Sequence, residues 1–228
     1  MEKFKYIHIQ NNSKNLFIYF NDMTQVGFSE HFSLYKQLNT IFNDFDILFI
    51  KDIAEYYWYL TIINPIIDLI SSLNNQYHYT NIYGFAGSSG SIGLLNTLPK
   101  ISNFRKAVII NGQVSLAKED VDKYRNCKDC YLFSENKIKE DYNKDYLIPL
   151  EYIKCNSKNR FTIPYKIQFY HNCSASDSVN HNILKNHYKL SFFELIYEGN
   201  VHGPFHGPYL IKKYHENCLK EYKNYFIS

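Results

Sequence analysis

The sequence predicts an α/β fold in which a mostly parallel sheet of about seven strands is covered by helices on both faces. Short apolar runs typical of buried strands recur along the chain and alternate with stretches of helical periodicity. The length of 228 residues is ample for one continuous core. Hydrophobic residues at 45% and charged residues at 21% are typical of a globular domain. Nowhere do about 18 consecutive apolar residues indicate a membrane-spanning helix.

The predicted strands share a high content of β-branched and aromatic residues and are bounded by turn residues. They cover residues 4–10, 15–20, 45–51, 80–86, 105–112, 165–172 and 192–199. Residues 4–10 alternate apolar and polar side chains, whereas residues 15–20 are almost all apolar. This pattern predicts that the first two strands form an antiparallel pair leading into a buried strand.

Three helices are predicted from capping residues and apolar spacing. Asn64 and Pro65 provide an N-cap and a first-turn proline for an amphipathic helix. A Gly/Ser turn directly after residues 80–86 leads into a second helix, which Pro99 ends. The last helix is expected to start at Pro208, because Leu210, Tyr214, Cys218 and Tyr222 repeat at intervals of four residues.

One long stretch interrupts this alternation of strands and helices. Residues 117–163 are rich in Lys, Asp, Asn and Tyr and lie between two core strands. An interruption of this length is usually functional or disordered, and we interpret it as a cap or lid over the carboxyl edge of the sheet. The chain, residues 1–228, is therefore predicted to be one domain with a cap insertion at about 117–163.

Charge and cysteine content narrow the function classes. The net charge is only +3 and no Lys/Arg block stands out, so a nucleic-acid partner is not expected. The start of the chain lacks the apolar run of a signal peptide, and the five cysteines are an odd number. We therefore expect a cytoplasmic protein with free thiols. Cys127 and Cys130 form a C-x-x-C without a second ligand pair, so no metal site is predicted.

A strand, a sharp turn and a helix meet at residues 87–91, the context in which a nucleophilic serine projects above a sheet. Residues two before and two after such a serine must be small, and around Ser89 these are Gly87 and Ser91. Ser88 and Ser91 are alternatives with equally small neighbours. Ser89 is preferred because Ser88 would put the turn inside the predicted strand and Ser91 would put it inside the helix.

The candidate acid and base follow in the order that an α/β-hydrolase requires, which is serine, acid and histidine. Asp177 comes just after the strand at 165–172, and His202 comes just after the strand at 192–199. The imidazole would take the serine proton, and the carboxylate would orient the imidazole. His206, four residues further on in the repeated His-Gly-Pro, is an alternative to His202.

The oxyanion formed during attack on a carbonyl needs preorganised N–H donors. With Ser89 as nucleophile, one donor is the N–H of Gly90. The second is expected from the loop after the strand at 15–20, where we nominate Met23, with Asp22 as the alternative.

The run AGSSGSIGLLNTLPKISNFRKAVIINGQ, residues 86–113, resembles the nucleophile segment of α/β-hydrolase-fold enzymes. More narrowly, the chain resembles bacterial capsular-polysaccharide O-acetyltransferases of that fold in its Gly-Ser-Ser turn, in the pair Asp177-Ser178 and in the late Gly199 to His202. The resemblance implies a minimal α/β-hydrolase fold and an acetyl-enzyme on Ser89. Acetyl-CoA would be the donor substrate, a polysaccharide or other carbohydrate hydroxyl would be the acceptor, and no cofactor would be tightly bound.

Further residues are candidates for substrate contacts. They are Asp22, Ser88, Trp58 and His206. The run Tyr56 to Tyr59 could stack on sugar or adenine rings, but packing of these rings against the sheet is the favoured interpretation. An esterase or deacetylase with the same triad and a non-catalytic binding module are the alternative functions. The sequence leaves the oligomeric state open between monomer and homodimer.

Overall fold

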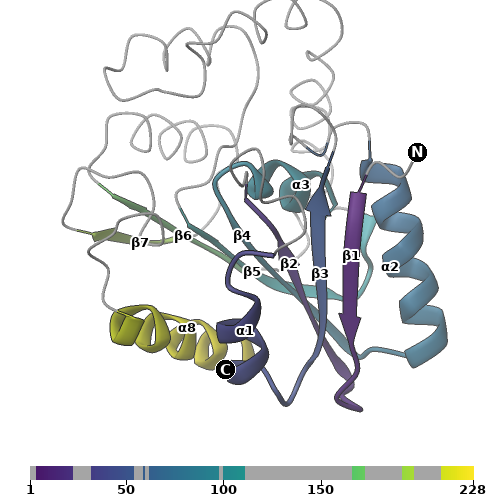
Figure 1. The fold of residues 1–228 in the computed structure, drawn as a ribbon, viewed down its shortest axis with the longest axis horizontal. Helices are drawn as coiled ribbons and strands as arrows, with labels where there is room; N and C mark the ends of the chain where they lie inside the picture. Colours follow the sequence, from purple (N-terminus) through teal and green to yellow (C-terminus); the bar gives the residue numbers. More distant parts are fainter. Residues whose placement is uncertain are drawn as a thin grey trace, which may run out of the picture.

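A seven-stranded sheet forms the centre of the molecule in the computed structural model (Figure 1). The structure describes residues 4–22, 32–53, 59, 62–97, 100–110, 166–172, 192–197 and 212–228. Its strands are β1 (Phe4–Ile9), β2 (Asn15–Phe20), β3 (Asp46–Asp52), β4 (Asn81–Gly87), β5 (Phe104–Ile110), β6 (Lys166–Asn172) and β7 (Phe192–Tyr197). All seven lie within a residue or two of the runs that the sequence predicts, because those runs are the apolar ones that a doubly covered sheet buries.

The strand order is β1-β3-β2-β4-β5-β6-β7, and every pair is parallel except β1 with β3. The predicted antiparallel pair of β1 and β2 is therefore wrong. Both edges of β2 are occupied by parallel neighbours, β3 and β4. Strand β1 therefore pairs with the other edge of β3 and is the edge strand of the sheet. Closeness in sequence indicated a hairpin, but β2 is buried along nearly its whole length and belongs in the sheet interior.

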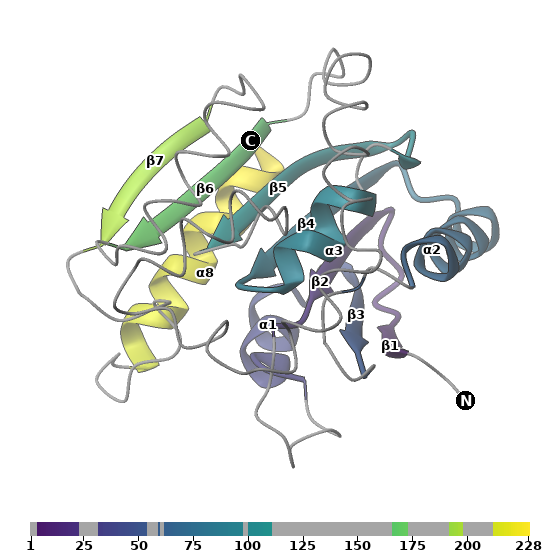
Figure 2. The ribbon, with the colours of Figure 1, turned by 90° about the horizontal axis from the view of Figure 1, so that it is seen from above.

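One face of the sheet is covered by α2 (Ile63–Tyr77) and α3 (Gly90–Thr97). Even-numbered residues of β2 and β3 point to this face, where Ile18, Phe20 and Ile50 pack with Ile66 and Ile92. Helix α3 lies against β4 and β2 (Figure 2). Because alternate residues of a strand point to the same face, one row of apolar side chains from each strand packs against these helices.

The other face is covered by α1 (Tyr35–Ile41) and α8 (Lys212–Ile227), which lie next to each other (Figure 1). Odd-numbered residues of β2, β3 and β4, together with Val108 of β5, supply this second core, in which Phe17 stacks on Phe42 at 4.0 Å between ring centroids. Tyr222, one of the residues predicted to form the apolar face of the last helix, is buried as expected. Pro208 lies outside the described residues, and the helix is described from Lys212.

The helix boundaries differ from the predictions in two ways. Helix α2 starts at Ile63 with Ile62 as its cap residue, so Asn64 is inside the first turn, where its Oδ1 accepts a hydrogen bond from Lys100 at 3.1 Å. Pro65 remains in the first turn, where its missing N–H costs nothing. Helix α1 was not predicted, because its seven residues provide too short a window for helical periodicity.

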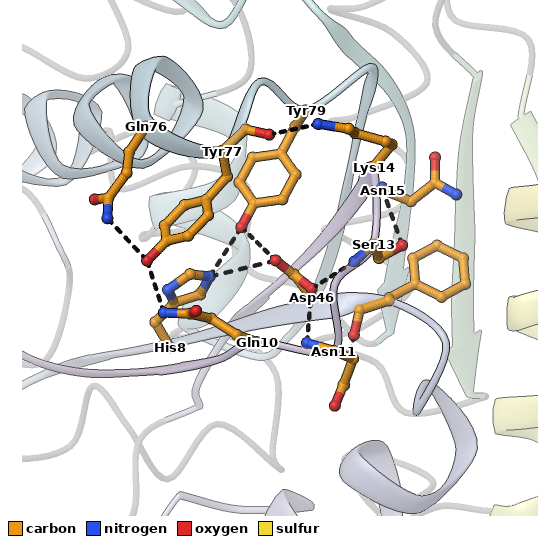
Figure 3. Close-up of polar contacts among 11 residues, drawn as sticks. His8, Gln10, Asn11, Ser13, Lys14, Asn15, Asp46, Gln76, Tyr77 and Tyr79 are labelled. Atoms are coloured by element: carbon orange, nitrogen blue, oxygen red, sulfur yellow. Dashed lines mark hydrogen bonds and ion pairs between the residues drawn. The ribbon is translucent and has the colours of Figure 1, made fainter.

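A polar cluster joins β1 to the amino ends of β3 and β4 (Figure 3). Asp46 Oδ1 accepts hydrogen bonds from the backbone N–H groups of Asn11 and Ser13 at 2.8 and 3.0 Å. Tyr79 donates to Asp46 Oδ2 at 2.7 Å, and His8 Nε2 lies 2.9 Å from the same hydroxyl. The carboxylate thus fixes the turn that carries the chain from β1 into β2.

Several predicted features lie outside the described residues. They are the cap at about 117–163, the cysteines Cys127 and Cys130, and the loops after β6 and β7. In the part of the chain that the structure describes, no helix is both long enough and apolar enough to cross a membrane. Within the same part, no group of three or more His, Cys, Asp or Glu side chains is arranged to hold a metal ion.

Candidate active site

The turn between β4 and α3 consists of Ser88 and Ser89. Strand β4 ends at Gly87 and α3 begins at Gly90. Ser88 has a positive φ of 46°, a conformation that costs a residue with a Cβ energy unless its surroundings impose it. The turn is closed by hydrogen bonds from Ser91 N to Ser88 O at 3.2 Å and from Ile92 N to Ser89 O at 3.1 Å. The strained residue of this strand-to-helix turn is therefore Ser88.

The two serines also differ in exposure. Ser88 retains 7% of its surface, whereas Ser89 retains 0%. The hydroxyl of Ser89 has no hydrogen-bond partner among the residues that the structure describes. A nucleophile must be reached by its substrate, so these exposures favour Ser88.

The residues two before and two after the nucleophile must be small, and these positions differ depending on whether Ser88 or Ser89 is taken as the nucleophile. A Cβ added to Gly90 would overlap the carbonyl oxygen of Phe20 at the end of β2, so this position requires glycine. Gly90 is two residues after Ser88, and Ala86 is two residues before it, so both small positions are filled. Two residues after Ser89 stands Ser91, whose hydroxyl donates to Ser88 O at 2.5 Å. The one position of the two that must be glycine, Gly90, is thus two residues after Ser88, which favours Ser88 as the nucleophile.

The end of β2 lies against this turn and carries Asn21 and Asp22, which are both buried. Asn21 N donates to Ile50 O of β3 at 2.9 Å. Asp22 Oδ1 accepts a hydrogen bond from the hydroxyl of Ser33 at 2.8 Å. Asp22, predicted to contact substrate or the oxyanion, is therefore adjacent to the turn but has its carboxylate engaged within the protein. Met23, the other predicted oxyanion residue, lies outside the described residues.

Buried ionisable groups surround the ends of β2 and β3. Burial lowers the pKa of Lys51, the nearby carboxylate of Asp22 acts in the opposite direction, and Lys5 adds to the lowering. Burial and the carboxylate of Asp52 raise the pKa of Tyr59 well above its usual value. Tyr59 thus keeps its proton and acts as a hydrogen-bond donor at this edge.

The remaining predicted site residues lie outside the described residues. They are Asp177, His202, His206 and Trp58. The strands that lead to the first two are described, because β6 ends at Asn172 and β7 ends at Tyr197. These strands run parallel to β4, so their carboxyl ends lie on the same edge of the sheet as the turn at Ser88. Asp177 and His202 each follow a strand end by five residues.

Sequence reasoning missed the polar residues that hold the end of β2. This support consists of Asn21, Ser33 and Tyr59, and the sequence pattern places Tyr59 only in an aromatic run. The position of Asn21 was a usable signal, because a polar residue directly after a buried parallel strand lies at the edge where ligands bind. The buried ring of Tyr59 confirms the preferred packing interpretation for that residue.

The sheet order, the covering helices and the strained turn after β4 define an α/β-hydrolase fold, and comparison with solved structures shows the same fold. No protein-family model matches the chain, and a search of curated protein sequences gives no significant match.

Three similar structures illustrate the range of proteins with this fold. A capsule O-acetyltransferase of Neisseria meningitidis serogroup A, a mutant in complex with CoA, has a TM-score of 0.67 at 15% identity, over 100% of this chain and 93% of the other. A lipase-esterase related protein from Clostridium acetobutylicum has a TM-score of 0.58 at 16% identity, over 98% and 99%. An esterase from Pyrobaculum calidifontis has a TM-score of 0.65 at 11% identity, over 98% and 84%. At these identities the likeness concerns the fold alone.

Proposed function

We propose that this protein is a serine acyltransferase that acetylates a polysaccharide hydroxyl through an acyl-enzyme, with acetyl-CoA as donor. The observation that carries the proposal is the positive φ of Ser88 at the junction of β4 and α3, at the carboxyl edge of an α/β-hydrolase sheet. Backbone strain at a non-glycine residue persists where the surroundings impose it, and it clusters at active sites. In this fold a nucleophilic serine occupies such a turn.

The proposed nucleophile is Ser88, one residue before the serine that the sequence favours. Ser88 has the strained backbone and the greater exposure, and the required glycine stands two residues after it. Its oxyanion donor would be the N–H of Ser89, the residue after the nucleophile, in place of the N–H of Gly90. The N–H of Ser89 lies directly before α3 and that of Gly90 lies in its first turn, so neither has a partner within the helix.

Asp177 and His202 remain the proposed acid and base, with His206 as the alternative base. Support comes from the parallel strands β6 and β7, whose carboxyl ends share an edge with the turn. The N–H groups that donate to the oxyanion would come from Ser89, directly before α3, and from the segment that begins at Asn21. Residues 117–163 would form the cap of this single domain.

The proposed reaction has two halves. The Ser88 hydroxyl attacks the thioester carbonyl carbon while His202 takes its proton, and the carbon–sulfur bond then breaks as the thiolate of CoA accepts that proton. A sugar hydroxyl next attacks the acetyl-enzyme, gives its proton to His202, and the proton returns to Ser88 as the serine ester breaks. The proposed location is the cytoplasm, where the five cysteines would remain free thiols.

Ester hydrolysis is the second candidate function, because esterases are among the proteins that share this fold. The same triad serves both reactions, and the difference lies in whether water or a sugar hydroxyl reaches the acyl-enzyme. A carbohydrate acceptor is supported only by the fold shared with a capsule O-acetyltransferase.

Labelling with a fluorophosphonate probe, followed by peptide mapping, tests the enzyme class and the nucleophile together. We expect the wild type and Ser89→Ala to be labelled on Ser88, and Ser88→Ala to remain unlabelled. Ser89→Ala is a matched control because the two serines are adjacent in one turn. Labelling of Ser88→Ala but not of Ser89→Ala would return the nucleophile to Ser89, and no labelling of the wild type would favour the non-catalytic alternative.

A further inference from the structure

Two residues of opposite charge are buried at the carboxyl ends of β2 and β3. Lys51, the last residue but one of β3, keeps 1% of its surface exposed, and Asp22, two residues beyond the end of β2, keeps 8%. Charged side chains are almost never buried this deeply unless an opposite charge compensates them. Burial lowers the pKa of Lys51, and the carboxylate of Asp22 is near enough to oppose that lowering. The two charges therefore compensate each other inside the protein.

The Asp22 carboxylate has a fixed place, because its neighbours hold both its backbone and its side chain. Its Oδ1 accepts a hydrogen bond from the hydroxyl of Ser33 at 2.8 Å, and its N–H donates to the hydroxyl of Tyr19. The amide Nδ2 of Asn21 donates to Asp22 O at 2.7 Å. These three hydrogen bonds keep the carboxylate at the carboxyl end of β2.

This place is beside the proposed nucleophile. Strands β2 and β4 are parallel neighbours in which Phe20 pairs with Ala86, and Asp22 and Ser88 each follow two residues later. A Cβ on Gly90 would overlap the carbonyl oxygen of Phe20, so the turn closely approaches the end of β2. Adjacent strands lie about 5 Å apart, which puts the carboxylate within about 10 Å of the Ser88 hydroxyl.

Negative charge develops at this edge when the proposed nucleophile attacks a carbonyl group, because the attack creates an oxyanion. The Asp22 carboxylate repels that oxyanion, and an ammonium group beside the carboxylate offsets the repulsion. At about 10 Å and an effective dielectric constant of about 20, one uncompensated unit charge changes a rate roughly ten-fold. Lys5 lies opposite Lys51 on β1, but it is partly exposed and water screens its charge. Of the two lysines, Lys51 therefore supplies the stronger compensation.

We propose that Lys51 is a positioning residue whose ammonium group cancels the charge of the Asp22 carboxylate beside the turn at Ser88, and so keeps that carboxylate from opposing the oxyanion. This inference rests on the proposed acyl transfer. Lys51 does not touch the substrate and acts only through Asp22. The lysine thereby allows a carboxylate that anchors the end of β2 through Ser33 to stand next to a site where negative charge forms.

Lys51→Met is the first test, because it keeps the aliphatic stem and removes the charge. Turnover of an aryl ester would be measured, and kcat should fall roughly ten-fold with little change in KM, since the charge acts on the oxyanion and not on the neutral ester. Lys106→Met is the matched control. Lys106 also lies on a strand and donates to Tyr225 O at 2.8 Å, but it pairs with Tyr83 near the amino end of β4. This control should retain wild-type kcat.

A double variant provides a readout that a merely structural role would not move. Asp22→Asn, added to Lys51→Met, removes the uncompensated charge at constant size, so kcat should rise several-fold from that of Lys51→Met. A structural role predicts no recovery, because the second substitution alters a further buried group. If Lys51→Met does not fold, Lys51→Gln takes its place in both comparisons.

Two results would overturn the role of Lys51: a kcat of Lys51→Met equal to that of Lys106→Met, or a double variant no faster than Lys51→Met. A wild type that neither turns over the ester nor reacts with fluorophosphonate would instead overturn the proposed function.

Discussion

At the scale of single residues, the backbone of Ser88 carries a cost that a glycine would not. A Cβ in the left-handed region costs roughly 1–2 kcal/mol. Ser88→Gly should therefore unfold at a higher denaturant concentration than Ser88→Ala, with a difference of about 1 kcal/mol in the free energy of unfolding. Both variants should lack acyl transfer. Urea titration of the two variants checks the prediction, and equal stabilities would mean that Ser88 is not strained.

Gly90 tests the close approach of the turn to the end of β2. Its missing Cβ leaves room for the carbonyl oxygen of Phe20, so Gly90→Ala must push the turn and β2 apart. We expect a loss of about 1–3 kcal/mol in stability, together with lower ester turnover.

Ser91→Ala is the control for that change, because a Cβ is already accommodated there and only the hydroxyl that donates to Ser88 O is lost. Ser91→Ala should lower the free energy of unfolding by about 1 kcal/mol. Wild-type turnover and stability in Gly90→Ala would contradict the fit between this glycine and β2.

The choice between Ser88 and Ser89 shows how far sequence reasoning reaches at a single residue. Gly-Ser-Ser-Gly-Ser contains overlapping small-x-Ser-x-small patterns, and composition alone cannot separate them. The distinction lies in one backbone angle and in the contact between Gly90 and Phe20, which depends on how α3 packs across β2. Both features are products of tertiary structure.

At the scale of elements, the half-buried His8 links β1 to the cluster around Asp46, where its Nε2 lies 2.9 Å from the hydroxyl of Tyr79. Burial lowers the pKa of His8 below 6.5, and the Asp46 carboxylate opposes this only in part. The unfolded chain therefore binds a proton on this imidazole more readily than the folded protein does. The stability that depends on a neutral His8 is fully present above pH 6.5 and is lost as the pH falls from there towards the folded-state pKa. The urea midpoint should accordingly be lower at about pH 5.5 than at about pH 7.5.

His8→Asn should reduce that pH difference in the urea midpoint. His78→Asn is the control, since His78 is exposed and asparagine tolerates its positive φ of 56°. The His78→Asn control should keep the wild-type difference in urea midpoint between the two pH values. If His8→Asn also keeps that difference, groups other than His8 cause the pH dependence.

Helix α8 is held by its apolar face. Phe226 is buried against Phe17, Phe42 and Tyr83, so Phe226→Ala should lower the free energy of unfolding by about 3–5 kcal/mol. The neighbouring Lys223 forms an ion pair with the exposed Asp44 and donates to Ile41 O at 2.8 Å. Lys223→Met should cost no more than about 1–2 kcal/mol. Chemical denaturation of both variants checks this ranking, and the reverse order would contradict it.

The strands could be predicted because their apolar runs are long and bounded by turn residues. The partner of β1 could not, because β1 and β2 are neighbours in sequence while both edges of β2 are taken by strands from further along the chain. Helix α1 escaped prediction because a seven-residue helix gains its stability from packing against α8 and the sheet. Element identity is thus local, whereas pairing is decided by the whole sheet.

At the scale of the whole molecule, the two edges of the parallel sheet have different tasks. The amino edge holds the cluster around Asp46, which joins β1, β3 and the segment before β4. The carboxyl edge holds the turn at Ser88 and the hydrogen bonds around Asn21, and the strands leading to Asp177 and His202 end there. Ligands of open α/β sheets bind at the carboxyl ends of the strands, so the proposed chemistry lies at the edge opposite the Asp46 cluster.

The central claim is that Ser88 accepts an acetyl group from acetyl-CoA, and the intact mass of the protein after incubation with acetyl-CoA tests it most directly. We predict that the wild type and Ser89→Ala each gain one acetyl group, that Ser88→Ala gains none, and that adding the glycan acceptor removes the acetyl group from the first two. A mass gain in Ser88→Ala that is lost in Ser89→Ala would contradict the assignment of the nucleophile. No gain in any variant, with an aryl ester still cleaved by the wild type, would contradict acetyl transfer and leave an esterase.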